Sequence, residues 1–175
     1  MTAADYEAHA LELGVAKARA FTGAWNRVRL FIAPAGGGQP SKTLKEQLSH
    51  HLDQRRVMTT IVELHDPEYV KVDIIIAELT VEPTYFNEQV QHAADQALRA
   101  LFAFDNVDFG QVFYLSKLYE KVEAVDGVRG VVINFKLRDR DAPADGKLRL
   151  DARQLPTLDD ESVQWTKVEG GLRDV

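Results

Sequence analysis

The sequence contains no cysteine, which excludes several kinds of chemistry at once. Without thiols the chain can form no disulfide framework, no thiolate zinc site and no cysteine nucleophile. Long apolar runs are absent too, because no stretch approaches the roughly 20 residues that cross a bilayer. The first residues lack the basic-then-apolar order of a signal peptide. The sequence therefore predicts a fold that is stabilised by packing and made in the cytoplasm.

Positive charge is in short supply. The 21 lysines and arginines face 27 aspartates and glutamates, which gives a formal charge of −6 at pH 7. Such a chain has no broad attraction for phosphate backbones or anionic lipids, so we expect neither nucleic acid nor a membrane as a partner. A chain of 175 residues can bury a sizeable core without help, as one domain or as two small ones.

The first unit, residues 1–67, is predicted to contain a helix, a hairpin, a second helix and a strand. Tyr6, Ala10 and Leu13 recur at helical spacing. The expected elements are a helix that starts at Thr2 or Asp5 and ends at Gly14, antiparallel strands at 15–21 and 27–33, a helix from Ser41 to about Arg56, and a strand at 59–64. Together they make one layer of helices on a sheet.

The second unit, residues 68–154, is predicted to begin with a long strand at 69–81 that has one apolar face. The elements expected after it are a helix from residue 84 or 87 to about 104, a loop at 105–110, a helix at 115–122 capped near Ser116, a strand at 128–137, a charged turn at 138–147 and a returning strand at 148–151. Residues 155–175 are predicted to form an extended, peripheral tail.

One local pattern occurs twice. A helix, a glycine and a strand follow one another at Gly14 and again at Gly127, which suggests two related halves. The predicted fold class is therefore α/β in the α+β sense. It consists of two small related α/β units with mixed or antiparallel sheets flanked by helices, and it is ferredoxin-like in character.

The loop at residues 36–43 is the strongest candidate for chemistry, because it follows a strand, opens a helix and nearly matches a phosphate-binding loop. Such a loop aims consecutive backbone N–H groups at anionic oxygens. Pro40 has no N–H, and Ser41 stands where the motif has its last glycine. We predict a flexible connection with a helix cap, and a nucleotide-binding enzyme that uses this loop is the alternative.

The histidines and carboxylates form no pattern typical of a metal or catalytic site. His50 and His51 are adjacent, and neighbours on a helix point about 100° apart, so they cannot easily share one ion with Asp53. The carboxylates that lie in polar turns, where solvation explains them, are Asp139, Asp141, Asp159, Asp160 and Glu161. We therefore predict no catalytic, cofactor-binding or metal-binding residue, no cofactor and no small-molecule substrate.

Aromatic residues are concentrated between positions 102 and 119, where most are expected to fill the core. A minority exposed near the loop at 105–111 would form an apolar patch for a protein partner. The strand around Trp165 is expected either to pair with a sheet edge of another subunit or to pack on its own domain. The candidate interface residues are Phe104, Phe109, Val112, Leu155, Leu158 and Trp165.

Short segments spread over most of the chain share their order and spacing with one known family. They are Asp5-Tyr6-Glu7, Ala10-Leu11-Glu12, residues 14–18, 28–34 with 36–38, 52–56, Thr59-Thr60, residues 69–73, 109–112, 114–119, 125–128 and 155–158. In this order they resemble the C-terminal part of the baseplate J-like proteins of contractile phage tails and related injection machines. Members of that family are usually longer, with an N-terminal portion that has no counterpart in this sequence.

The resemblance implies a structural role without enzymatic activity, because the family has no catalytic motif to carry over. It implies a wedge subunit of a contractile baseplate, made in the bacterial cytoplasm and assembled into a phage tail, a prophage or a tail-like particle. The partners implied are other wedge proteins, hub proteins and further copies of the chain in a ring. A small α/β protein-binding module is a further alternative.

Overall fold

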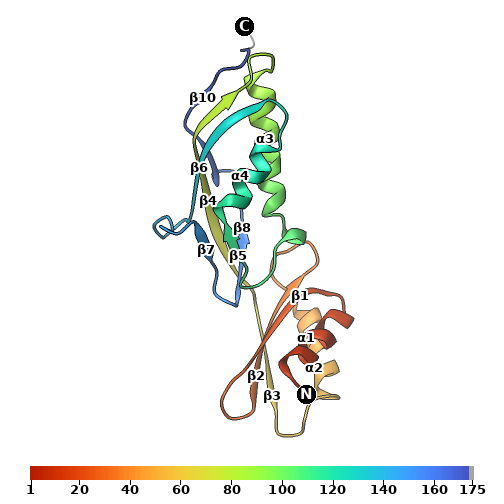
Figure 1. Cartoon of the computed structure of the whole chain (residues 1–175). Coiled ribbons are helices and arrows are strands. Elements are labelled where there is room, and N and C mark those ends of the chain that lie inside the picture. The colour runs from red at the N-terminus through yellow and green to blue at the C-terminus, as the bar shows by residue number, and fades with distance from the viewer. Residues whose placement is uncertain (174–175) are drawn as a thin grey trace. The chain divides into compact units, whose positions relative to one another are not determined.

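The structure is a computed structural model that describes residues 1–173 (Figure 1). Contacts divide the chain into two compact units, which are described separately. Unit 1 comprises residues 1–68, 108–110 and 151–155, and unit 2 comprises residues 69–107, 111–150 and the described residues from 156 onward. Both units combine helices with sheets, and the strands pair in both directions, so the predicted α+β class is confirmed.

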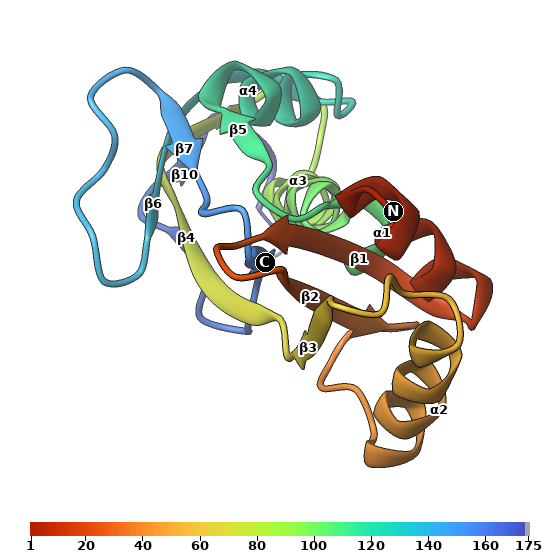
Figure 2. The same cartoon turned by 90° about the horizontal axis from the view of Figure 1, so that it is seen from below.

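Unit 1 has the predicted order of helix, hairpin, helix and strand. Its elements are α1 (Ala3–Glu12), β1 (Val15–Thr22), β2 (Arg27–Pro34), α2 (Lys42–Asp53) and β3 (Ile61–His65). Strands β1 and β2 form an antiparallel hairpin, and β3 runs parallel to β2, so the sheet order is β1-β2-β3. Helices α1 and α2 lie beside this sheet (Figures 1 and 2).

The helix ends of unit 1 follow from local chemistry. Thr2 caps α1 in a reciprocal capping box, in which its Oγ1 accepts from the backbone N of Asp5 at 3.3 Å and its own backbone N donates to the Asp5 carboxylate at 2.6 Å. Gly14 follows the helix with a φ of +83°, a left-handed conformation that favours glycine. Ser41 caps α2 by accepting from the backbone N of Leu44 at 3.2 Å.

The core of unit 1 lies between the helices and one face of the sheet. Alternate residues of the strands point to this face, because side chains of a strand alternate between its two sides. The residues that fill it are Tyr6, Ala10, Val15, Ala20, Val28, Leu30, Ile32, Leu48 and Leu52. Burying this apolar surface holds α1 and α2 in fixed positions relative to each other.

Unit 2 is built around the long strand β4 (Glu68–Val81). Its further elements are α3 (Asn87–Leu101), the 3₁₀ turn η1 (Phe104–Asn106), β5 (Val112–Tyr114), α4 (Leu115–Glu123), β6 (Val128–Leu137), β7 (Lys147–Arg149), β8 (Gln154–Thr157), β9 (Val163–Trp165) and β10 (Val168–Glu169). Strand β4 pairs antiparallel with β6 and parallel with β9 and β10. Apolar residues of β4 and β6 pack with α3 and α4 into one core.

Two local predictions for unit 2 are wrong. Strand β7 pairs with β5, not with β6, so the strand at 148–151 does not complete a hairpin across the charged turn. Helix α4 begins after Tyr114 and has no side-chain cap, so Ser116 does not cap it. The predicted tail is extended as expected, and its strands β9 and β10 pair with β4, so the strand around Trp165 packs on its own domain.

Within residues 1–173, no helix has the length and apolar composition that a membrane crossing requires.

Candidate functional site

The glycine loop connects β2 to α2 and is closed by its own helix cap. Gly36, Gly37 and Gly38 all have positive φ angles, between 80° and 86°. The backbone N of Gly37 donates to the carbonyl of Pro34 at 3.1 Å, and the backbone N of Leu44 in α2 donates to the side chain of Ser41, which caps the helix. Lys42, the residue that would reach a phosphate, lies 3.7 Å from Glu46 on the exposed side of the helix. This geometry favours a connection over a phosphate cradle.

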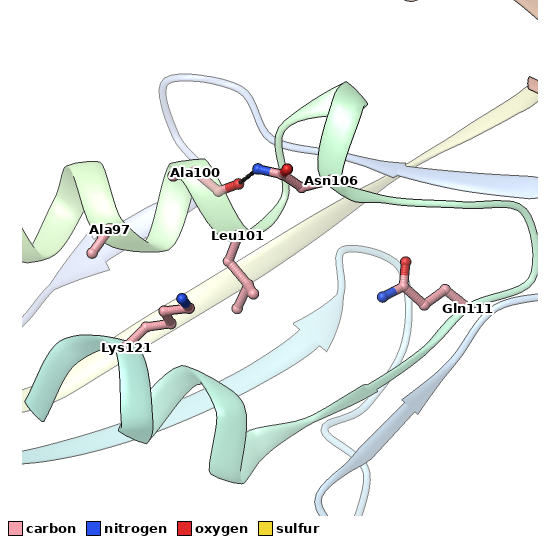
Figure 3. A pocket seen from close by; sticks show the side chains of 6 residues that line it. All are labelled: Ala97, Ala100, Leu101, Asn106, Gln111 and Lys121. Carbon is pink, nitrogen blue, oxygen red and sulfur yellow. Dashed lines mark hydrogen bonds between the residues drawn. The ribbon is translucent and has the colours of Figure 1, made fainter. Parts of the chain in front are cut away.

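A shallow pocket of about 380 Å³ lies in unit 2 between α3 and α4 (Figure 3). Its lining is mostly aliphatic, with Ala97, Ala100 and Leu101 on one side and Lys121 on α4. The amide of Asn106, which also lines the pocket, donates to the carbonyl of Ala100 at 2.7 Å. A pocket with one charged side chain offers no acid and base pair for catalysis.

The carboxylate that sequence reasoning assigned to solvent, Asp159, belongs to an ion network in unit 2. Arg138 donates to Asp159 at 2.7 and 2.9 Å and to Asp73 on β4 at 2.8 and 3.0 Å. Lys71 lies 3.0 Å from Asp159, and Ser162 donates to it at 3.0 Å. The network joins the end of β6, strand β4 and the segment before β9.

The charges of this network fix one another. The hydrogen bonds from Arg138, followed by that from Lys71, hold the pKa of Asp159 far below its ordinary value. The same contacts, with Asp159 first and Asp73 second, raise the pKa of Arg138. Both groups therefore stay charged throughout the physiological range. Such a locked arrangement stabilises the fold and is unsuited to proton transfer, which needs a pKa near the working pH.

The six predicted interface residues differ widely in exposure. Phe109 and Leu155 are 2% and 0% exposed, so their side chains offer almost no surface to a partner. Phe104, Leu158 and Trp165 are half-buried, while Val112 is exposed on β5. The exposed part of the predicted set consists of Val112 and parts of three side chains, and the contact role of all six residues stays a prediction.

A larger apolar surface lies elsewhere, at one end of the unit 1 sheet. Trp25 in the hairpin turn is 91% exposed, and Met58 in the loop before β3 is 96% exposed. Val57 and Ile61, beside Met58, are also exposed. The two loops are joined because the backbone N of Ile61 donates to the carbonyl of Asn26 at 2.9 Å. We call Trp25, Val57, Met58 and Ile61 the apolar tip. Exposed apolar side chains that gather on neighbouring loops are typical of protein contacts.

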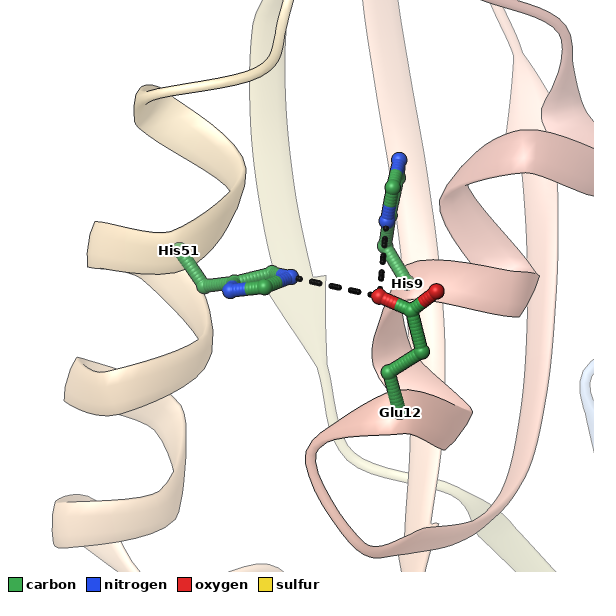
Figure 4. Close-up of side chains that lie close together, drawn as sticks. All are labelled: His9, Glu12 and His51. Atoms are coloured by element: carbon green, nitrogen blue, oxygen red, sulfur yellow. Dashed lines mark hydrogen bonds and ion pairs between the residues drawn. The ribbon is translucent and has the colours of Figure 1, made fainter.

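The adjacent residues His50 and His51 face different sides of helix α2. His50 is exposed and lies 3.0 Å from the amide nitrogen of Gln54. His51 points the other way, toward α1, where His9 and Glu12 lie close to it (Figure 4). Sequence reasoning missed this cluster because it considered only His51 with its neighbours in sequence. The packing of α1 on α2 brings His9 and His51 together across 42 positions.

Residues 1–65 match the family model of the Baseplate J-like central domain. This match covers nearly all of the main segment of unit 1 and confirms there the resemblance to baseplate J-like proteins. It also refines that resemblance, since the matching part is the central domain of the family.

Among solved structures, the fold is similar to that of a chain in the cryo-EM structure of the anti-feeding prophage (AFP) baseplate, 6-fold symmetrised. The TM-score is 0.70 with 15% sequence identity, and the similarity covers 91% of this chain and 37% of that chain. The likeness thus extends through both units, and the chain spans little more than a third of the solved chain's length. No curated protein matches the sequence.

Proposed function

We propose that the chain as a whole belongs to the baseplate J-like proteins and serves as a structural component of a contractile injection-system baseplate. The observation that carries the proposal is the agreement of two comparisons. The family match covers residues 1–65, and the fold similarity to the anti-feeding prophage baseplate extends over 91% of the chain, including unit 2. A fold by itself does not determine function, but here the sequence family and the fold lead to the same machine.

We further propose that the chain is a wedge subunit that contacts copies of itself, other wedge proteins and the hub. The apolar tip supports this role, because Trp25 and Met58 are almost fully exposed. Burying apolar side chains of this size against a partner lowers the free energy. A neighbouring baseplate subunit would cover them. Strand β3 is an edge strand of the unit 1 sheet and begins at the tip, so it offers backbone groups for pairing beside the apolar side chains.

A nucleotide-binding enzyme receives less support than a structural subunit. The loop at 36–43 would have to supply consecutive N–H groups to a phosphate, yet Pro40 has none and Ser41 caps the helix itself. We therefore assign no catalytic role to this loop. Titration of ATP and magnesium against the thermal unfolding of the chain tests the assignment, since a bound ligand stabilises the folded state.

The assembly proposal is tested by the incorporation of variants into particles. We would express the wild-type chain, Met58→Asp and a control, Val132→Asp, in the bacterium that carries the gene, and purify its contractile particles. Val132 is an exposed apolar residue on β6 in the other unit. An aspartate at a buried contact leaves a charge without a partner, at a cost of several kcal/mol, and each 1.4 kcal/mol lowers binding about tenfold.

We expect the wild-type chain and Val132→Asp to appear in the particles and Met58→Asp to be depleted at least tenfold, measured by immunoblot against a sheath protein. Equal incorporation of both variants would contradict a role for the apolar tip. Absence of the wild-type chain from intact particles would contradict the baseplate assignment itself. The two failures are therefore distinguishable.

A further inference from the structure

Two histidines and a glutamate converge between the helices of unit 1 (Figure 4). His9 and Glu12 are three residues apart on α1, which places them on the same face of that helix. His51 extends from α2 toward them. The Nδ1 atom of His9 lies 3.2 Å from Oε2 of Glu12, and Nε2 of His51 lies 3.7 Å from the same oxygen. All three candidate ligand atoms lie within 4.8 Å of one another.

The Nε2 atom of His51 supplies a second observation. It is buried, and it makes no hydrogen bond with any residue in the described range 1–173. A buried polar atom without a hydrogen bond is rare and calls for an explanation. This one is directed at the Glu12 carboxylate, at a distance too long for a hydrogen bond and suited to an ion between the two groups.

We propose that His9, Glu12 and His51 form a binding site for a divalent transition-metal ion of the zinc class. Two imidazole nitrogens and one carboxylate oxygen are the ligands that zinc takes in many sites, with water completing the coordination. In a tetrahedral site with bonds of about 2.0–2.1 Å, neighbouring ligand atoms are about 3.4 Å apart. The two separations from Oε2 of Glu12, 3.2 and 3.7 Å, bracket that value, and the two imidazole nitrogens lie within 4.8 Å of each other. Glu12 is 61% exposed and is free to adjust its side chain to the ion.

The packing of unit 1 fixes the backbone positions of the three ligand residues before an ion binds. Ala10 follows His9 and Leu52 follows His51, and both of these apolar residues are fully buried in the core that joins the two helices. The backbone positions of the ligands are therefore fixed by burial, without the ion. Small rotations of three side chains complete the coordination, so the entropy cost of forming the site is low. A bound ion would link α1 to α2.

Arg55 is a positively charged neighbour of the site and should weaken the binding of a metal ion. It lies one helical turn after His51, and its Nη1 donates to Nδ1 of His51 at 3.1 Å, since a guanidinium has no acceptor. The neutral ring then carries its proton on Nε2, where the metal must bind. When the metal binds, the proton on Nε2 is lost and the ring takes up a proton on Nδ1. The exposed guanidinium of Arg55 must then move away from Nδ1, although it can still donate to the carbonyl of His51. Removal of Arg55 should therefore strengthen binding.

Zinc titration of the full chain tests the site. Thermal unfolding is measured for chelator-treated protein with increasing Zn²⁺ in a buffer without phosphate. We expect the melting temperature to rise by roughly 5–10 °C when Zn²⁺ reaches about 100 times its Kd. Mg²⁺, which prefers all-oxygen ligands, should give no shift.

Matched variants decide whether the three residues are responsible. His50→Ala removes the exposed histidine next to His51 and should keep the full zinc shift. His51→Ala should abolish the shift, and Glu12→Gln, at a position that is 61% exposed, should weaken it at least tenfold in zinc concentration. Co²⁺ gives an independent readout, because a tetrahedral nitrogen and oxygen site produces visible absorption whether or not stability changes.

Two results would overturn the proposal. One is the same zinc shift in His51→Ala, Glu12→Gln and the wild-type chain, which would mean binding elsewhere. The other is the absence of any saturable shift or cobalt absorption in the wild-type chain up to about 1 mM metal, a range that covers even weak protein sites.

Discussion

The buried carboxylate of Asp73 gives the sharpest prediction about stability. Asp73 is 5% exposed, and its Oδ1 accepts from Nε and Nη2 of Arg138 at 3.0 and 2.8 Å. Replacement by asparagine keeps the volume and removes the charge. A hydrogen bond to a charged group contributes about 1.5–3 kcal/mol and a neutral one about 0.5–1.5, a difference of about 1 kcal/mol for each bond. For two bonds, Asp73→Asn should lower the free energy of unfolding of unit 2 by about 2 kcal/mol.

Urea unfolding followed by tryptophan fluorescence measures this change. The chain has two tryptophans, Trp25 in unit 1 and Trp165 on β9 in unit 2. A Trp25→Phe background leaves Trp165, which pairs with Ile76 of β4, as the reporter of unit 2. Linear extrapolation of the transition gives the free energy of unfolding for each variant.

Asp141→Asn is the matched control, because Asp141 is exposed in the turn after β6 and such surface changes stay within about 0.5 kcal/mol. A difference of less than about 0.5 kcal/mol between Asp73→Asn and Asp141→Asn would refute the reasoning. It would mean that Arg138 is held well enough by Asp159 alone.

Two further predictions concern unit 2. The pKa of Asp159 is lowered from the ordinary value of 3.8, mainly by Arg138. The carboxylate therefore stabilises the folded state above that pH and loses this effect as the pH falls below about 4. In that window the urea midpoint should fall with pH, and it should fall less steeply in Asp159→Asn. Gly127 has a φ of +92°, and an added Cβ would lie 2.6 Å from the Tyr85 ring. Gly127→Ala should therefore lower the free energy of unfolding by about 2–4 kcal/mol. The control Gly130→Ala on β6, with open space around the added Cβ, should change the urea midpoint little.

Local sequence patterns predicted most of the elements, because helix caps and hydrophobic periods act over a few residues. The capping box of Thr2, the left-handed Gly14 and the apolar face of β4 are all visible in the sequence. Pairing between distant segments is not. The partner of β7 is β5, and nothing in the residues of either three-residue strand specifies the other. The predicted hairpin with β6 relied on proximity in sequence and was therefore wrong.

The candidate sites were missed for the same reason. Asp73 and Arg138 are 65 positions apart and become neighbours only when β4 pairs with β6. His9 and His51 come together only when α1 packs on α2. The sequence does contain one usable signal for the second cluster, since His9 and Glu12 lie on one face of α1, three residues apart. It gains meaning only with a partner on the facing helix.

The most direct test of the proposed function is a cryo-EM reconstruction of contractile particles from the organism that carries the gene. The account predicts that the folds of units 1 and 2 fit density in the baseplate, repeated around the particle axis, with the apolar tip against a neighbouring subunit. Baseplate density that is fully explained by other proteins, with this chain absent from the particles by mass spectrometry, would contradict it.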